Sequence, residues 1–295
     1  MKKLLLLIVF LCFSGSIISQ EREVIAQSED ITIYESLVSK TSKNNLFPTF
    51  FKNGLIYNAV DKNEFYNPFY VDSILGKQKI KVGYRFRLGG MTTHENTIYF
   101  TGISKRMDAN FNYNLCIYKG NLEKNKVSKI RKLDFCDPGF TYSHPTISSD
   151  GNKLMLVSNE KNQFHLLEFT KDEKGEWGQK KVVYIIHQSF DIINPTYFGD
   201  DTVYFSSNYY EGKIKQISLN MEKGKLQRTI RDMETGSFNI YKIERKKNHW
   251  SIPEKVIALS SESDDLGALF ITEKSGYLTS YRYNNSDNIY YFELK

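Results

Sequence analysis

The chain has 295 residues, of which 25% are charged, 40% are hydrophobic and 14% are aromatic. This length suits one large domain or two modest ones. The formal net charge of +6 is dispersed along the chain. Dispersed charge argues against a nucleic-acid-binding protein, because such proteins gather Lys and Arg on one face.

The first 20 residues have the layout of a secretory signal peptide. Lys2 and Lys3 precede an apolar run from Leu4 to Phe13, and small and polar residues follow as far as Gln20. The run is shorter than the roughly 20 apolar residues that span a bilayer. We expect residues 1–20 to be removed on export, and residues 21–295 to be periplasmic, outer-membrane associated or secreted. No later stretch is apolar enough to cross a membrane.

Cys12 raises an alternative, a lipid-anchored accessory subunit of an envelope machine. A lipoprotein signal places a small residue immediately before its cysteine, whereas Leu11 precedes Cys12. Cleavage near Ser19 or Gln20 is therefore the preferred interpretation.

The remainder of the chain is rich in strand-forming residues. Tyr and Phe number 20 each, Pro numbers only 6, and long helical periodicity is absent from the sequence. Short runs of β-branched and aromatic residues, bounded by Gly, Asn, Asp or Lys, predict strands. These runs occupy residues 54–60, 96–103, 114–122, 153–159, 164–170, 201–208, 238–245 and 288–294.

An internal repeat organises these strands. Pro48-Thr49, Pro145-Thr146 and Pro195-Thr196 each precede a strand, a short turn and a second strand that ends in small polar residues. Units therefore start near residues 44, 88, 141, 192 and 262, and most spacings fit propeller blades of about 40 to 50 residues. A full unit has four predicted strands, which is one blade of a β-propeller.

The two ends of the chain are expected to close the ring. The last unit stops after its third strand, and residues 30–38 offer a strand that supplies the fourth. Closure of this kind removes exposed sheet edges. Residues 209–236 are either an inserted loop or a cramped sixth blade, and we favour the insertion because residues 238–245 resume the expected third strand. The prediction is an all-β protein, a single propeller of five to six four-stranded antiparallel blades.

The repeat resembles the WD40-like Pro-Asp β-propeller repeat, the TolB-type repeat of bacterial envelopes. The match is clearest in the segment from His144 to Asn159, with its Asp150-Gly151 turn, and continues in 195–208 and 264–290. The last of these is similar to the closing repeat of outer-membrane proteins of Bacteroidetes, in which the propeller often accompanies an OmpA-like domain. The resemblance implies the fold and an envelope location better than it implies an activity.

No catalytic constellation is evident in the sequence. Ser143, His144 and Asp150 are close in sequence, but a strand of about five residues places His144 and Asp150 roughly 16 Å apart, too far for a relay. No pattern for a metal or a cofactor is present. Residues at the starts of the first strands, His144, Asn194, Asp264 and Asp265, are candidate binding residues at one rim of the channel.

Two cysteines follow the signal peptide, Cys116 and Cys136. They either form a disulfide between neighbouring strands or remain separate buried thiols.

The function that the sequence favours is an exported, non-catalytic propeller. Its expected partner is an envelope protein or a cell-wall or glycan component, with no nucleic acid and no cofactor. The alternative is a glycan-processing hydrolase in which acids such as Asp191, Asp264 and Asp265 project into the channel.

Overall fold

The computed structural model describes residues 22–40, 43–60, 65–83, 86–160, 163–209, 212–283 and 285–295. The expected signal peptide, residues 1–20, and Cys12 lie outside these ranges. Within them the chain forms strands and one short 3-10 helix, η2 (Ile257–Leu259), and no α-helix. The described part thus offers no helix with the length and hydropathy that a membrane crossing requires.

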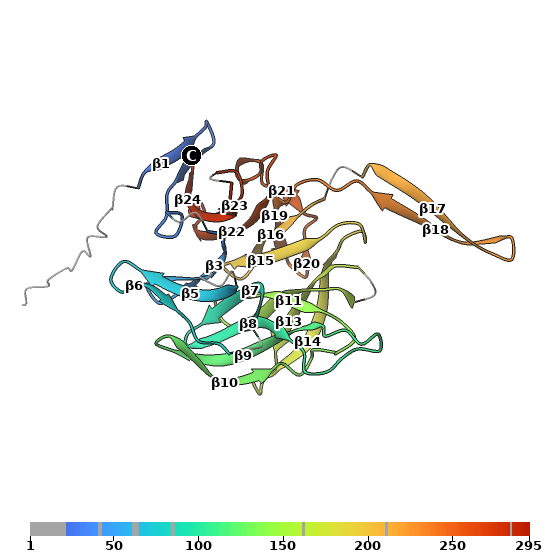
Figure 1. The fold of residues 1–295 in the computed structure, drawn as a ribbon, viewed down its shortest axis with the longest axis horizontal. Helices are drawn as coiled ribbons and strands as arrows, with labels where there is room; N and C mark the ends of the chain where they lie inside the picture. The colour runs from blue at the N-terminus through green and yellow to red at the C-terminus, as the bar shows by residue number, and fades with distance from the viewer. Residues whose placement is uncertain are drawn as a thin grey trace, which may run out of the picture.

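Five antiparallel sheets make up the body of the molecule (Figure 1). Three sheets have four strands each. They comprise β3 (Asn45–Phe51), β4 (Gly54–Val60), β5 (Tyr66–Asp72) and β6 (Gly76–Lys79); β7 (Phe86–His94), β8 (Thr97–Ile103), β9 (Leu115–Glu123) and β10 (Lys126–Lys132); and β11 (Tyr142–Ile147), β12 (Lys153–Ser158), β13 (His165–Lys171) and β14 (Trp177–Ile185).

The other two large sheets have five strands. One contains β15 (Ile192–Phe198), β16 (Thr202–Ser207), β19 (Asn239–Lys246), β20 (His249–Trp250) and β21 (Glu254–Lys255). The other combines both ends of the described chain: β22 (Asp265–Thr272), β23 (Ser275–Ser280), β24 (Asn288–Leu294), β2 (Ile31–Tyr34) and β1 (Val24–Gln27). The predicted all-β class is confirmed.

The first strand of each large sheet lies next to the first strand of the following sheet. We use "first strands" for β3, β7, β11, β15 and β22. They contact one another in that order, and β22 contacts β3. Each first strand therefore lies beside two others, and Figure 1 shows the five large sheets packed together in the body of the molecule.

In four of the large sheets the second strand, β4, β8, β12 or β16, is buried at every position except its ends. Burial on both faces explains why these strands contain apolar runs rather than an alternating pattern. In β12, Leu154, Met155 and Leu156 are all fully buried. The edge strands β6, β10 and β14 carry lysines instead, such as Lys126 and Lys180. Lysine on an edge strand discourages pairing with another chain.

Strand β2 pairs antiparallel with β24, with Ile33 opposite Phe292. Ile33 is 1% exposed and belongs to the same apolar cluster as Phe292. A segment near the start of the described chain thus completes a sheet formed by its end.

A β-bulge recurs in the first strands. The residue before each proline has a left-handed backbone: φ is 54° at Phe47, 50° at His144 and 48° at Asn194. The pairing register shifts at the same places. The prolines therefore lie inside their strands rather than at strand starts, because a bulge leaves one residue without a ladder hydrogen bond.

Strands β17 (Ile214–Glu222) and β18 (Lys225–Met233) form a separate two-stranded sheet. They lie within 209–236, the segment expected as an insertion. Figure 1 shows this hairpin extending well away from the five large sheets. The next strand, β19, pairs with β16 and so continues the sheet that the hairpin interrupts.

Candidate functional site

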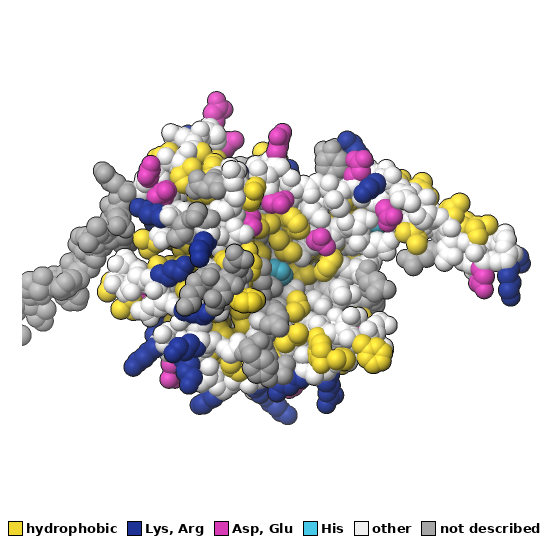
Figure 2. Space-filling model, in the orientation of Figure 1, with side chains coloured by type: hydrophobic (Ala, Val, Ile, Leu, Met, Phe, Trp, Pro, Cys, Tyr) yellow, Lys and Arg dark blue, Asp and Glu magenta, His cyan; other side chains and the backbone are white. Residues whose placement is uncertain are grey.

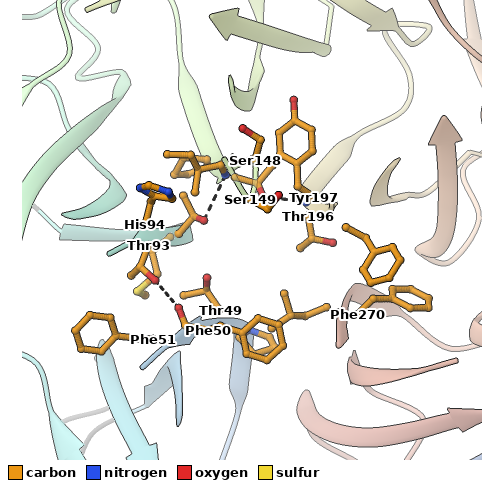
Figure 3. A pocket seen from close by; sticks show the side chains of 18 of the residues that line it. Thr49, Phe50, Phe51, Thr93, His94, Ser148, Ser149, Thr196, Tyr197 and Phe270 are labelled. Carbon is orange, nitrogen blue, oxygen red and sulfur yellow. Dashed lines mark hydrogen bonds between the residues drawn. The ribbon is translucent and has the colours of Figure 1, made fainter. Parts of the chain in front are cut away.

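A pocket of about 580 Å³ opens among the C-terminal halves of the first strands. All five first strands contribute to its wall. Figure 3 shows side chains from each of them facing the pocket or its edge, and Figure 2 shows hydrophobic side chains gathered around the middle of this face. The pocket is the place where residues far apart in the sequence come together.

Threonines at matching positions connect the walls of the pocket to one another. The Tyr197 N–H donates to Thr146 Oγ1 at 3.0 Å, across the boundary between β15 and β11. The Ile147 N–H donates to Thr92 Oγ1 at 3.4 Å across the preceding boundary. Because these hydroxyls accept hydrogen bonds from neighbouring strands, they connect the strands that form the wall.

Two further threonines act as donors across sheet boundaries. Thr196 Oγ1 donates to the Ala268 carbonyl at 2.5 Å, and Thr93 Oγ1 donates to the Phe50 carbonyl. For Thr146 and Thr196 the sequence signal is the Pro-Thr pair that marks the repeat, whereas Thr92 and Thr93 follow no proline.

The mouth of the pocket exposes two large apolar side chains. Phe50 on β3 is 39% exposed and Ile271 on β22 is 45% exposed. Among the described lining residues the charged side chains are Lys52 and Glu95, both exposed, and His94 is the only histidine. The pocket therefore has an apolar mouth, a hydroxyl-lined wall and a sparse charged rim.

The sequence-predicted rim residue His144 is not among the residues that line the pocket. Its ring meets the Phe47 ring edge-on at a centroid distance of 5.1 Å. Its Nδ1 is buried and has no hydrogen-bond partner among the described residues. Burial lowers the pKa of His144 to about 3, so the ring is neutral at physiological pH.

Asn194 and His144 occupy matching positions in β15 and β11. A Cβ atom at Gly267 would come within 1.9 Å of Asn194 Nδ2, and a Cβ atom at Gly90 would come within 3.2 Å of His144 Nδ1. Each side chain therefore packs closely on a glycine of a neighbouring first strand. Asn194 also lines the pocket.

Asp265 is fully buried at the start of β22. Its Oδ1 accepts hydrogen bonds from Arg282 Nη2 at 2.6 Å and Nε at 3.0 Å, and its Oδ2 accepts one from Ser261 Oγ at 2.9 Å. Burial raises the pKa of Asp265, while the Arg282 guanidinium opposes the rise. Asp265 therefore bonds to the protein itself, and it lies at the opposite end of β22 from the residues that line the pocket.

Asp264 and Asp191 also bond to the protein itself. Asp264 Oδ1 accepts the Phe238 N–H at 2.9 Å, and Asp191 Oδ2 accepts Asn208 Nδ2 at 3.4 Å. Neither residue lines the pocket, so the structure does not bring Asp191, Asp264 and Asp265 together there.

Cys116 and Cys136 are both fully buried free thiols. The Ile117 N–H donates to Cys136 Sγ at 3.3 Å. A hydrogen bond between the two thiols lowers the pKa of Cys116 to about 7 and raises the pKa of Cys136. The two side chains are thus neighbours in reduced form.

The fold has counterparts among solved structures. A putative TolB from Agrobacterium tumefaciens shares it. This similarity has a TM-score of 0.50 and 11% sequence identity, and covers 86% of this chain and 91% of that one. Identity this low shows a common fold and nothing about activity.

Two other similar structures score slightly lower. TolB from Acinetobacter baumannii has a TM-score of 0.48 at 10% identity, covering 86% of this chain, which spans only 56% of that protein. The soluble aldose sugar dehydrogenase of Escherichia coli has a TM-score of 0.49 at 7% identity, covering 90% and 99% of the two chains. No family model and no curated protein matches the chain, so membership of the Pro-Asp repeat family stays a prediction.

Proposed function

We propose that this chain is an exported, non-catalytic, five-bladed propeller that binds a protein partner in a bacterial envelope through an apolar side chain placed in the central pocket. In this proposal the five large sheets are the blades, the pairing of β2 with β24 closes the ring, and β17–β18 is an insertion in the fourth blade. The signal-peptide layout of residues 1–20 supports export.

The observation that carries the proposal is the apolar mouth of the pocket. Phe50 and Ile271 remain partly exposed there, whereas threonine hydroxyls in the wall already bond neighbouring strands. A bulky apolar side chain gains from burial at such a site. A retaining or inverting hydrolase would need two carboxyl groups at the site. Glu95 is the only acidic residue among the described lining residues.

A peptide-display selection against residues 22–295 tests this function. We expect the selected peptides to share a bulky apolar residue. In fluorescence polarisation, the Phe50→Ser and Ile271→Ser variants should each weaken peptide binding by about tenfold or more, the scale of an interface hot spot.

The matched control is Ile252→Ser, which changes an aliphatic residue that is 81% exposed and does not line the pocket. It should leave peptide binding unchanged. Peptides that bind both pocket variants as tightly as the unaltered chain would contradict the proposal. So would turnover of a cell-wall oligosaccharide by the purified protein.

A further inference from the structure

The β17–β18 hairpin is amphipathic, and its two faces can be assigned from the strand register. Residues directly opposite each other in an antiparallel pair point to the same face. Leu219 lies opposite Thr229, Ile217 opposite Arg231 and, beyond a bulge, Met221 opposite Leu226. One face therefore carries Ile217, Leu219, Met221 and Leu226, together with Thr229 and Arg231. We call it the apolar face.

The other face of the hairpin is polar. It carries Gln216 opposite Asp232, Ser218 opposite Ile230 and Glu222 opposite Lys225. Apolar and polar residues thus alternate along β17, as they do in a strand that buries one face.

Nothing within the described residues covers the apolar face. Ile217, Met221 and Leu226 are each 54% exposed, and Leu219 is 61% exposed. Figure 2 shows hydrophobic side chains along the projecting hairpin. A lone two-stranded hairpin is marginally stable in water, and four clustered aliphatic side chains on one face indicate a surface that becomes covered.

The charge of the hairpin restricts what covers it. Residues 214–233 contain five basic and two acidic residues. Lys223 (φ 48°) and Gly224 (φ 75°) form the tight turn at the tip, and Lys225 follows at once. Lys223 therefore lies in the turn itself, and Lys225 lies beside it on the polar face of the hairpin. Both are within two residues of Met221 or Leu226 in the sequence.

We propose that the β17–β18 hairpin docks its apolar face on an anionic lipid surface, with Lys223 and Lys225 placed among the headgroups. Aliphatic side chains that enter the boundary between headgroups and acyl chains, flanked by cations, anchor amphipathic segments in this way. Each Lys near an anionic membrane strengthens binding about fivefold. The hairpin extends away from the body, so its tip can approach a flat surface (Figure 1).

A second copy of the chain fits the same face less well. Two hairpins of the same positive charge would repel each other. Four half-exposed side chains also cover far less than the roughly 800 Å² that each partner buries in a standard interface. A lipid surface avoids both difficulties, and the inference does not depend on the function proposed for the central pocket.

Co-sedimentation with vesicles tests the inference. Residues 22–295, which contain every described strand and exclude the apolar N-terminal run, are mixed with vesicles of phosphatidylcholine alone or with 30% phosphatidylglycerol. We expect binding to the anionic vesicles that weakens in high salt. The double variant Lys223→Asn with Lys225→Gln should bind about 25-fold more weakly. Leu219→Ser with Leu226→Ser should bind at least tenfold more weakly.

Two matched variants complete the test. Ile252→Ser alters an exposed aliphatic residue on the body and should bind as the unaltered chain does. Replacing residues 214–232 by two glycines should abolish binding; the Glu234 N–H donates to the Lys213 carbonyl at 2.8 Å, so the cut ends already adjoin. Equal sedimentation of the deleted and unaltered chains would overturn the inference. A concentration-dependent dimer that Leu219→Ser dissociates would assign the face to a second copy instead.

Discussion

His144 illustrates how a single residue can look functional in the sequence and be confined in the fold. It lies beside Ser143 and near Asp150, yet its ring packs against Phe47 and its Nδ1 is buried without a partner. Its backbone is left-handed, a conformation that costs about 1 kcal/mol or more for most residues and less for Asn. Asn194 occupies the matching position of the next sheet with nearly the same φ.

This environment predicts a pH-dependent stability. The pKa of His144 is lowered to about 3 in the folded chain and is about 6.5 when unfolded. Protonation therefore favours unfolding, so the contribution of His144 is present above pH 6.5 and is lost as the pH falls toward 3. At pH 5 the loss is about 2 kcal/mol. His144→Asn should remove it, and urea denaturation at pH 7.5 and pH 5 measures the difference. Identical pH profiles for the two proteins would contradict the assignment.

Asp265 forms an ion pair with Arg282, a partner that the sequence alone does not indicate. The two are 17 positions apart and meet because β23 returns the chain to the start of β22. If the protein were a glycan hydrolase that used Asp265, this carboxylate would have to project into the central channel. Packing instead buries this carboxylate beside a guanidinium, where the ion pair offsets its desolvation.

At the scale of elements, the first strands are joined sideways by threonine hydroxyls. Thr146 on β11 accepts the Tyr197 N–H of β15, and both residues are buried. An N–H that loses such a partner away from water costs about 1–3 kcal/mol. This connection is distinct from the ladder hydrogen bonds within each sheet.

We therefore expect Thr146→Val to lower the free energy of unfolding by about 1–3 kcal/mol. Valine preserves the shape of threonine but removes the hydroxyl oxygen. Thr146→Ser keeps that oxygen and should cost less, although it removes a methyl group. Chemical denaturation of the two variants measures the comparison; a serine variant less stable than the valine variant would show that the methyl group matters more than the hydroxyl.

At the scale of the whole molecule, the two ends of the described chain share one sheet. Ile33 on β2 is 1% exposed and lies opposite Phe292 on β24. Val24 on β1 belongs to the same sheet but is 52% exposed. Substitutions at these two positions therefore distinguish the contribution of the β2–β24 pairing from that of β1, the edge strand of the same sheet.

Ile33→Ala should destabilise the protein by about 3 kcal/mol, because it removes a fully buried aliphatic side chain from this junction. Val24→Ala, in the same sheet, should cost well under 1 kcal/mol, as is usual for exposed positions. Denaturant midpoints with unchanged slopes measure both effects. Equal, small effects of the two substitutions would mean that β2 contributes little to holding the ends together.

The sequence by itself determined the strand content, the repeat and the positions of the first strands. These features depend on local patterns: Pro-Thr pairs, turn residues such as Gly151, and apolar runs such as Leu154 to Val157 that strands buried on both faces require. The Asp150-Gly151 turn illustrates this, since Gly151 has the positive φ, 73°, that the sequence implied.

Only the tertiary structure decided which residues form a site. The pocket, the Asp265–Arg282 ion pair and the packing of His144 on Phe47 depend on contacts between different strands. The same holds for the hairpin, because an alternating pattern such as Ile217, Leu219 and Met221 predicts one covered face in any sheet. That this face is exposed follows from where the fold places it, since burial is a property of packing and not of local sequence.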